Sequence, residues 1–102
     1  MTDFALEVYD AIRKIPDGKV LSYGHLAELA GRPNAARAVG NILHKNPWPK
    51  DVPCYKIVHS DGRLAPAFAF GGIDRQRELL MAEGIMVINN KVDMSEYEWH
   101  ME

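Results

Sequence analysis

The sequence predicts a small, mainly α-helical domain with short β-strands, and three observations carry this prediction. The 102 residues fit one domain spanning 1–102, and a hydrophobic content of 47% is enough for one modest core. Residues 4–15 repeat apolar side chains at helical spacing. Residues 23–30 and 35–45 form two further predicted helices separated by a short glycine-containing turn, a pattern typical of a helix-turn-helix.

The first helix is predicted over residues 4–15, with Asp3 as its N-cap. Pro16 and a turn at 17–18 follow it, and residues 19–21 form a short predicted strand. The apolar face of the helix consists of Phe4, Val8, Ile12 and Ile15.

The helix-turn-helix is predicted from its capping residues and from the segment that interrupts it. Ser22 can cap the helix over 23–30, because a serine hydroxyl accepts a hydrogen bond from a free backbone N–H of the first turn. Residues 31–34, Gly-Arg-Pro-Asn, break the pattern, and Asn34 can cap the helix over 35–45.

The second half of the chain alternates loops with short regular elements. Residues 46–53 hold three prolines and are predicted to be irregular, and 55–58 form a candidate strand. Residues 64–72 form an apolar loop that ends in two glycines, and 73–83 form a helix that stops before Gly84. Smaller predicted features are a turn at 60–62, a strand at 85–87 and a turn at 89–90; the tail with Tyr97 and Trp99 has no assigned element.

The charge is unevenly distributed along the chain. The net charge is −2, yet residues 32–56 hold five Lys or Arg against one acid, a local charge of +4 that leaves −6 for the rest. Such polarity suits phosphate binding on one face, although an ordinary scatter of surface lysines explains the same count. One cysteine, no signal peptide and no membrane-length apolar window predict an intracellular, cytoplasmic protein without membrane contact.

The single cysteine, Cys54, lies in the stretch "VPCYKIV" directly after Pro53. A thiol reacts only as a thiolate, so a reactive Cys54 needs a base, a cation or a helix N-terminus to lower its pKa. Burial as a small hydrophobic residue is the alternative. Glu83 ends a predicted helix, where the helix dipole disfavours an acid, so it either has a specific partner or is solvated at the surface.

Several segments in order resemble the C-terminal domain of the O6-alkylguanine-DNA alkyltransferases and the shorter alkyltransferase-like proteins of the same family. They are "GKVLSYGHLAELAGRPNAARAVGNILHKNP", "VPCYKIV", "SDG" and "GG…LLMAEG", at the family's spacing over about Phe4 to Gly84. The resemblance implies a winged helix-turn-helix DNA-binding domain of the alkyltransferase C-terminal type, without the family's separate ribonuclease-H-like N-terminal domain. It also implies a monomer that binds the minor groove of double-stranded DNA containing alkylated guanine.

The resemblance assigns a role to each matching position. Arg37 matches the finger that fills the vacated base stack, and Tyr23 matches the residue that turns the 3′ phosphate. Asn46 matches the hinge before the active-site loop, Cys54 the alkyl acceptor, and Glu83 the acid of the cysteine–histidine–glutamate relay. The remaining implied DNA contacts are Ala35, Ala36, Gly40, Lys45 and Ser60, and the implied pocket residues are Pro53, Ile57, Phe68 and Phe70. In this family a thiolate displaces guanine from the alkyl carbon irreversibly, and neither a metal nor an organic cofactor takes part.

Two departures from the family pattern bear on the chemistry. The relay histidine is replaced by Tyr55, whose phenol has a reference pKa near 10 against about 6.5 for histidine, so it is a poor proton acceptor. The tyrosine and serine before the double glycine are replaced: the serine aligns with Phe70, and the tyrosine with Ala69 or, with a shift, Phe68. Phenyl rings stack on a base but donate no hydrogen bond to its O6 atom.

Three functional hypotheses therefore stay open. Cys54 favours a suicide alkyltransferase, since the alkyltransferase-like proteins replace this cysteine, commonly by tryptophan. Tyr55, the apolar lid and the missing N-terminal domain favour a lesion sensor that binds O6-alkylguanine and recruits excision-repair proteins. A winged-helix DNA-binding module without lesion chemistry is the third, and the retained pocket sequence around Cys54 argues against it.

Overall fold

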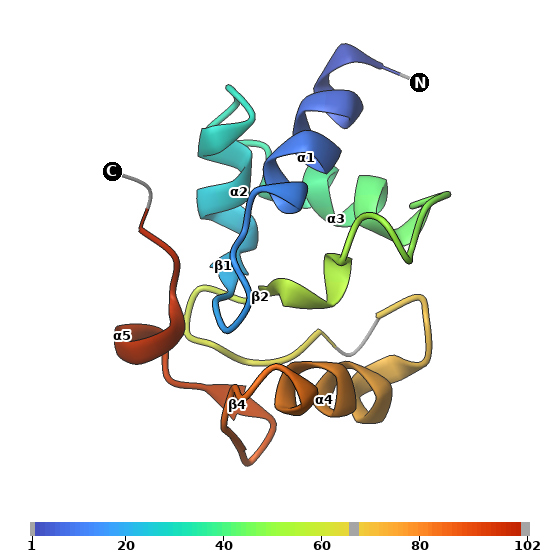
Figure 1. Cartoon of the computed structure of the whole chain (residues 1–102). Coiled ribbons are helices and arrows are strands. Elements are labelled where there is room, and N and C mark those ends of the chain that lie inside the picture. Colours follow the sequence, from blue (N-terminus) through green and yellow to red (C-terminus); the bar gives the residue numbers. More distant parts are fainter. Residues whose placement is uncertain (1, 66–67, 101–102) are drawn as a thin grey trace.

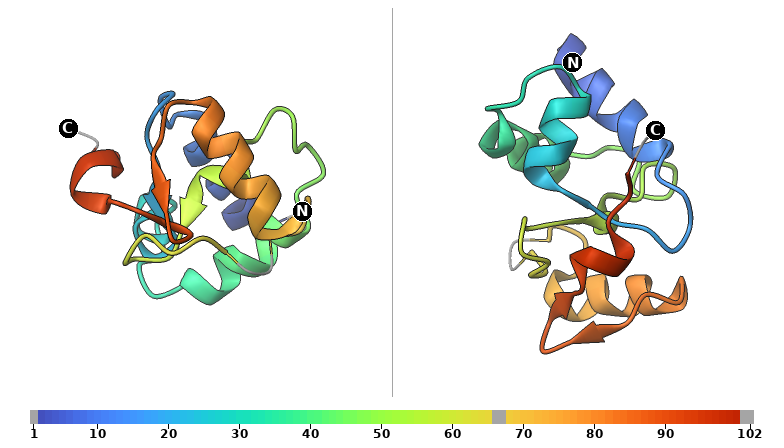
Figure 2. Two further views of the ribbon diagram at one scale, coloured as in Figure 1. Left: turned by 90° about the horizontal axis from the view of Figure 1, so that it is seen from below. Right: turned by 90° about the vertical axis from the view of Figure 1, so that its left-hand side faces the viewer.

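The computed structural model describes residues 2–65 and 68–100, which fold into two layers with a short parallel strand pair between them (Figure 1). Helices α1, α2 and α3 form one layer, and α4 with a β-hairpin and a short helix α5 forms the other (Figure 2). The elements are α1 (Asp3–Arg13), β1 (Leu21–Ser22), α2 (Tyr23–Leu29), α3 (Ala36–His44), the 3-10 turn η1 (Cys54–Lys56), β2 (Ile57–Val58), α4 (Gly72–Ala82), β3 (Val87–Ile88), β4 (Lys91–Val92) and α5 (Met94–Tyr97).

Helix α1 forms where its apolar periodicity predicts it, but its cap is different. The Thr2 hydroxyl accepts a hydrogen bond from the Ala5 backbone N–H at 3.1 Å, so Thr2 is the N-cap and the prediction of Asp3 is wrong. Asp3 lies in the first turn instead, where its negative charge opposes the positive end of the helix dipole. The predicted apolar face, including Val8 and Ile12, is buried in the core.

The helix-turn-helix is confirmed, with one of its two predicted caps. The Ser22 hydroxyl accepts from the His25 N–H at 3.1 Å and starts α2. Helix α3 begins one residue later than predicted, with Ala35 as N-cap and no side-chain cap, so the prediction of Asn34 is wrong. Asn34 is exposed in a turn that the hydrogen bond from Ala35 N–H to the Arg32 carbonyl closes, at 3.0 Å.

A parallel strand pair joins the two layers. Leu21 of β1 is opposite Ile57 of β2, and each strand begins two residues later than predicted. Cys54–Lys56 form a 3-10 turn instead of the first part of the predicted strand. The turn follows Pro53, whose ring restricts the local backbone, and it places Cys54 immediately before the buried strand β2.

The C-terminal layer contains the predicted helix and turn, with small shifts. Helix α4 covers Gly72–Ala82 and has Glu83 as its C-cap. The predicted strand at 85–87 is displaced to β3, which pairs with β4 in an antiparallel hairpin. The turn between them is confirmed: Asn89 and Asn90 have φ values of 53° and 57°, the left-handed pair that a tight hairpin requires.

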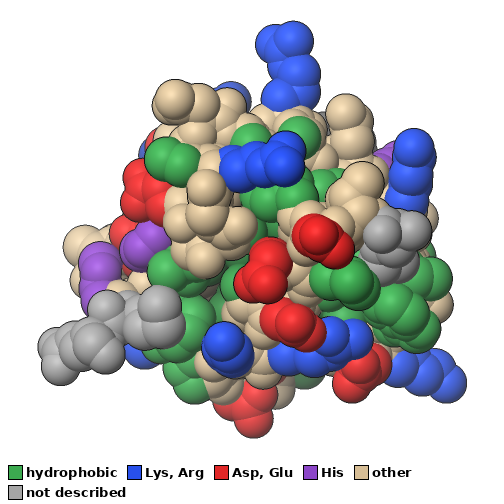
Figure 3. Space-filling view, turned by 90° about the horizontal axis from the view of Figure 1, so that it is seen from above, with side chains coloured by type: hydrophobic (Ala, Val, Ile, Leu, Met, Phe, Trp, Pro, Cys, Tyr) green, Lys and Arg blue, Asp and Glu red, His purple; other side chains and the backbone are tan. Residues whose placement is uncertain are grey.

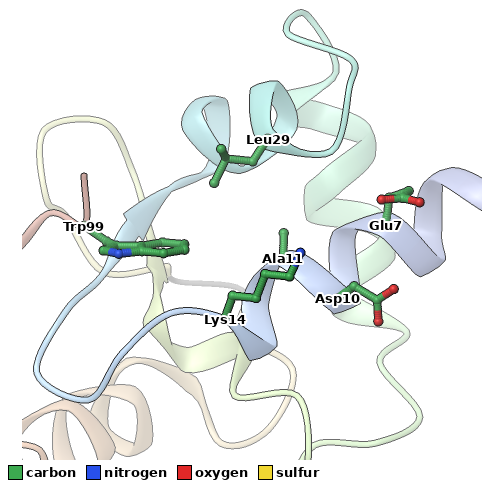
Figure 4. Close-up of a pocket in the computed structure, with 6 residues that line it drawn as sticks. All are labelled: Glu7, Asp10, Ala11, Lys14, Leu29 and Trp99. Carbon is green, nitrogen blue, oxygen red and sulfur yellow. The ribbon is translucent and has the colours of Figure 1, made fainter. Parts of the chain in front are cut away.

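The tail, which sequence patterns leave unassigned, returns to the helical layer. The Val20 N–H donates to the Tyr97 carbonyl at 2.9 Å, and the Trp99 N–H donates to the Val20 carbonyl at 2.8 Å, so the tail extends the sheet beside β1. Figure 4 shows the Trp99 ring beside a cavity of about 60 Å³ that Ala11, Lys14 and Leu29 also line. The tail thereby ties α5 to α1 and α2.

The buried hydrophobic residues form two clusters that meet at the 3-10 turn. The first fills the space among α1, α2 and α3 and includes Cys54. The second lies under α4 and the hairpin, and Tyr55 packs against it. Consecutive side chains therefore belong to different cores, which separates the environment of Cys54 from that of Tyr55.

The outer surface carries charges of both signs. The face seen from the α1 side interleaves acidic and basic side chains around small hydrophobic areas (Figure 3). Within the described residues, no helix combines the length and apolar character needed to cross a membrane.

Candidate nucleic-acid interface and thiol site

A cavity of about 630 Å³, called the larger cavity, opens between the helix-turn-helix and the loop before α4. Helix α3 contributes its exposed side with Arg37 and Gly40, and α2 contributes Tyr23 from its first turn. Cys54 and Phe68 form part of the opposite wall. The full lining is Tyr23, Ala36, Arg37, Gly40, Asn41, Leu43, His44, Cys54, His59, Ala65, Phe68 and Ala69.

A second cavity of about 400 Å³, called the smaller cavity, also borders Cys54. Cys54 and Phe68 line both cavities, so the thiol stands where the two spaces meet. The lining of the smaller cavity is Pro49, Lys50, Cys54, Tyr55, Phe68, Phe70, Arg75 and Leu79. The two phenyl rings are in edge-to-face contact, with centroids 5.8 Å apart, so Phe68 and Phe70 form one aromatic wall.

The Cys54 thiol is buried and weakly activated. Burial raises the pKa of Cys54, and a hydrogen bond with the Asn46 side chain offsets part of that rise. Asn46 is fixed by two further hydrogen bonds, from its Nδ2 to the Val52 carbonyl at 3.0 Å and from the Trp48 N–H to its Oδ1 at 2.8 Å. Among the described residues no imidazole is hydrogen-bonded to Cys54. The thiol is therefore protonated at neutral pH.

Tyr55 contacts Glu83, where the family relay has a histidine. Its hydroxyl donates a hydrogen bond to Glu83 Oε2. Burial, followed by the bond to this carboxylate, raises the pKa of Tyr55, because the phenolate would lose its solvent and face a like charge. Tyr55 thus stays a neutral donor, and its proton is directed away from the sulfur. The other carboxylate oxygen of Glu83 accepts from the Gly18 N–H at 3.0 Å.

Lys56 is buried beside Tyr55 and Glu83. It is one of the cations counted in the basic segment 32–56, so this burial differs from the expected surface position. Its side chain is 3% exposed, and its Nζ lies 3.3 Å from Glu83 Oε1. It also donates to the carbonyls of Ile15 and Pro16, each at 3.2 Å. The ammonium group therefore links the segment after α1 to the end of α4, and it also lies 3.6 Å from the carboxylate of the exposed Asp17.

Gln76 is a site-supporting residue that sequence reasoning missed. It is fully buried on α4, and its Oε1 accepts from the Ala65 N–H at 2.8 Å. Its Nε2 donates to the carbonyls of Tyr55 and Ile57 at 3.0 Å and 3.1 Å. Gln76 thus fixes the turn that carries Cys54 and the start of the loop over the cavities. A glutamine inside a polar helical stretch carries no signal that would single it out.

The predicted DNA contacts fall into two groups in the structure. Arg37 is exposed at the rim of the larger cavity, beside Ala36 and Gly40, and Tyr23 faces the His59 ring at 5.4 Å. His59 was not among the predicted residues, although it follows β2 directly. The other predicted contacts lie elsewhere: Ala35 is half-buried at the start of α3, and Lys45 and Ser60 are exposed outside both linings.

The predicted pocket residues also divide. Phe68 and Phe70 line cavities, whereas Ile57 is fully buried in the first hydrophobic cluster and packs as a core residue. Pro53 is half-buried as the cap of the 3-10 turn and acts through the backbone. No group of three or more His, Cys, Asp or Glu side chains in the described ranges is arranged to hold a metal ion.

Comparison with known proteins agrees with this geometry. Residues 3–85 match the family model described as 6-O-methylguanine DNA methyltransferase, DNA binding domain. This chain belongs to that family. The match covers the helix-turn-helix, the 3-10 turn with Cys54 and helix α4, so both cavities lie inside the family domain.

The relatives of this chain have two kinds of name. The DNA base-flipping protein of Vibrio parahaemolyticus is 35% identical over 97% of this chain and 98% of the relative, and that of Escherichia coli is 36% identical over 95% and 74%. The methylated-DNA–protein-cysteine methyltransferase of Salmonella typhimurium is 44% identical over 85% of this chain, which spans about 50% of that relative.

Solved structures divide in the same way. S. pombe Atl1 in complex with damaged DNA containing O6-carboxymethylguanine has a TM-score of 0.90 and 32% identity, with 99% of this chain and 98% of that chain covered. Mycobacterium tuberculosis OGT in complex with DNA has a TM-score of 0.75 and 40% identity, over 82% of this chain and 50% of that chain. The proteins similar to this chain therefore include methyltransferases and DNA base-flipping proteins, and one of the base-flipping relatives matches over nearly its full length.

Proposed function

We propose that this protein binds duplex DNA containing an O6-alkylated guanine and holds that base, flipped out of the helix, in the larger cavity. A purine stacked inside a duplex exposes only its groove edges and neither of its faces, so enclosing the base and its O6 substituent in a protein cavity requires extrusion. The unstacking costs a few kcal/mol, and contacts made in the cavity and in the vacated stack must offset it.

The observation that supports this most is the composition of the larger cavity. One wall comes from the recognition helix α3 with Arg37 at its rim, and the opposite wall contains Cys54 and Phe68. A base that leaves the stack beside Arg37 enters the cavity between these walls. Phe68 offers a ring face for stacking, and Arg37 can occupy the gap left in the DNA.

Equilibrium binding by fluorescence anisotropy tests this proposal. We compare a duplex containing one O6-methylguanine with the same duplex containing guanine, at several salt concentrations because phosphate contacts make affinity depend on salt. The lesion duplex is expected to bind at least about tenfold more tightly, because an O6-alkylated guanine pairs poorly and costs less to extrude than guanine. Placing 2-aminopurine beside the lesion reports the flip, since its fluorescence rises when its neighbour leaves the stack. Equal affinity for both duplexes would overturn the proposal.

Stoichiometric transfer of the alkyl group to Cys54 is a second candidate, favoured by the position of the thiol on the cavity wall. The thiol first gives its proton to solvent, and the sulfur then attacks the alkyl carbon. A C–S bond forms as the C–O6 bond breaks, its electron pair stays on the guanine, and the guanine takes up one proton. The product is guanine in DNA and a thioether at Cys54, so each molecule acts once.

The raised pKa of Cys54 and the engagement of Tyr55 with Glu83 make this transfer slow. The lesion complex then persists much longer than the time it needs to form, and it marks the damaged site for other repair proteins. Intact-protein mass after incubation with excess O6-methylguanine duplex decides whether transfer occurs. Addition of one methyl group that is absent from Cys54→Ala supports transfer; an unchanged mass with persistent lesion-selective binding leaves recognition as the whole function.

A further inference from the structure

The smaller cavity combines an apolar lining with two cationic side chains. Its walls are aromatic and aliphatic, with Pro49, Phe70 and Leu79 around the space behind Cys54. Its lining also includes two cationic residues, Lys50 and Arg75, and no acidic residue. An apolar chamber with two cationic side chains at its edge favours a ligand that is part hydrocarbon and part anion.

The position of Cys54 connects this chamber to a base held in the larger cavity. Cys54 and Phe68 line both spaces, so a guanine whose O6 points at the sulfur directs its O6 substituent toward the smaller cavity. A volume of about 400 Å³ is far more than a methyl group occupies. The chamber is therefore suited to longer substituents.

We propose that the smaller cavity binds the O6 substituent and selects substituents that end in a carboxylate, with Lys50 and Arg75 as the residues that determine this specificity. The inference rests on the proposed function, because the substituent arrives with the flipped base. It names the lesion class within O6-alkylguanines that this chain prefers, namely short chains ending in an anion, such as carboxymethyl.

The surroundings of the two cations permit this role. Arg75 Nη1 donates to Glu78 Oε2 at 2.9 Å, an exposed pair on α4 that uses one of the five N–H donors of the guanidinium. Within the described residues no other protein acceptor takes an Arg75 N–H. Lys50 is exposed at the edge of the proline-rich loop, close to Pro49. Cys54 is a neutral thiol, so it does not repel a nearby carboxylate.

Arg77 provides a matched control on the same helix. It forms the same kind of (i, i+3) pair, with Asp74 at 2.8 Å, and in addition donates to Asn90 at 2.5 Å. It lines neither cavity. Lys91 of β4 is an exposed lysine that also lies outside both linings. The double variant Arg77→Gln/Lys91→Gln therefore removes the same charge as Lys50→Gln/Arg75→Gln without touching the chamber.

The test compares the affinities of duplexes containing O6-carboxymethylguanine and O6-carbamoylmethylguanine, which have nearly the same shape and differ by one charge. O6-methylguanine and guanine duplexes accompany them in the same assay. The unmodified protein is expected to prefer the carboxymethyl lesion about tenfold, the contribution of a charge-assisted hydrogen bond that is partly screened by solvent. Lys50→Gln/Arg75→Gln should reduce this preference to near unity, and the control double variant should retain it.

The ratio of the two affinities cancels any general loss of attraction to DNA. Equal affinity for the two lesions in the unmodified protein, or a preference that survives Lys50→Gln/Arg75→Gln, would overturn the assignment of the smaller cavity. Neither result affects the discrimination of O6-methylguanine from guanine, which measures the proposed function separately. Loss of that discrimination in the unmodified protein would remove the basis of both.

Discussion

The helix-turn-helix side of the molecule and the relay side differ in how their polar groups are used. On the helix-turn-helix side, Arg37 is exposed, and it and Tyr23 face an open cavity. On the relay side, the hydroxyl of Tyr55 and both carboxylate oxygens of Glu83 have partners inside the protein, and Lys56 completes the network. The first region presents its functional groups outward, and the second satisfies them internally.

This difference separates recognition of a lesion from chemistry on it. The groups that a flipped base and a DNA backbone would contact are accessible. At the position of the group that would activate the thiol, Tyr55 instead donates a hydrogen bond to Glu83. Arg37 and Tyr23 thus remain accessible beside an open cavity, whereas the residue next to Cys54 is no proton acceptor for the thiol.

The substitution with the largest expected effect is Tyr55→His, which restores a base beside Cys54. Tyr55→His introduces a proton acceptor next to Cys54 with Glu83 available to orient it, and general-base assistance typically contributes about 10²–10⁴-fold. Single-turnover transfer of methyl from an O6-methylguanine duplex should accelerate by about 10²-fold. Tyr55→Phe, which removes the hydroxyl and supplies no base, is the control and should give no such gain. A slower Tyr55→His variant would mean that Tyr55 itself promotes the reaction.

Removing the cation from the network of Tyr55, Lys56 and Glu83 should lower the stability of the fold. Lys56→Met removes the partner of a nearly buried carboxylate and leaves two backbone carbonyls without their donor. The free energy of unfolding measured with urea should fall by about 3 kcal/mol. Lys91→Met, at an exposed site on β4, should change it by less than about 0.5 kcal/mol. Equal stabilities of the two variants would contradict the role given to Lys56.

A substitution on the helix-turn-helix side should weaken DNA binding and leave the stability of the fold unchanged. Arg37→Ala removes the side chain at the rim of the larger cavity, and affinity for the O6-methylguanine duplex should drop at least about tenfold, the value of one stacking contact. Arg77→Ala removes the same charge on the opposite layer and should change affinity much less. Unchanged lesion affinity in Arg37→Ala would remove the residue from the interface.

The pH dependence gives the smallest effect and reports on the thiol alone. Burial raises the pKa of Cys54, so the thiolate fraction is small at neutral pH and grows about tenfold per pH unit until that pKa is reached. Transfer followed by intact mass should therefore accelerate about tenfold per unit from pH 7 upward, while lesion binding stays nearly constant. A rate that is flat across this range would indicate a thiolate already formed at pH 7.

The sequence carries enough information for the fold because local signals and apolar periodicity agree along most of the chain. The spacing of Val8 and Ile12, the Ser22 cap and the Asn89-Asn90 turn each involve residues close in sequence, and each was predicted correctly. The cap of α3 was not, because Ala35 takes the position that a polar side chain usually fills. The resemblance to the alkyltransferases indicated most of the residues of the candidate site.

The hydrogen-bond partners of the buried polar side chains could not be predicted from the sequence. Lys56 counts as a surface cation in any composition, and only the approach of the end of α1 to the end of α4 buries it. Gln76 gains its role by reaching Ala65, Tyr55 and Ile57 from another element. The division of the space around Cys54 into two cavities likewise depends on where Phe68 packs, which no local pattern encodes.

The most direct test of the separation between recognition and reaction follows both in one sample. The protein is mixed with excess O6-methylguanine duplex at neutral pH, and complex formation by anisotropy and methylation by intact mass are recorded over the same time course, with Cys54→Ala in parallel. The account predicts a lesion-selective complex in both proteins at once, and at most a far slower mass gain, confined to the protein that retains Cys54. Methylation as fast as binding, or a complex with no preference for the lesion, would contradict it.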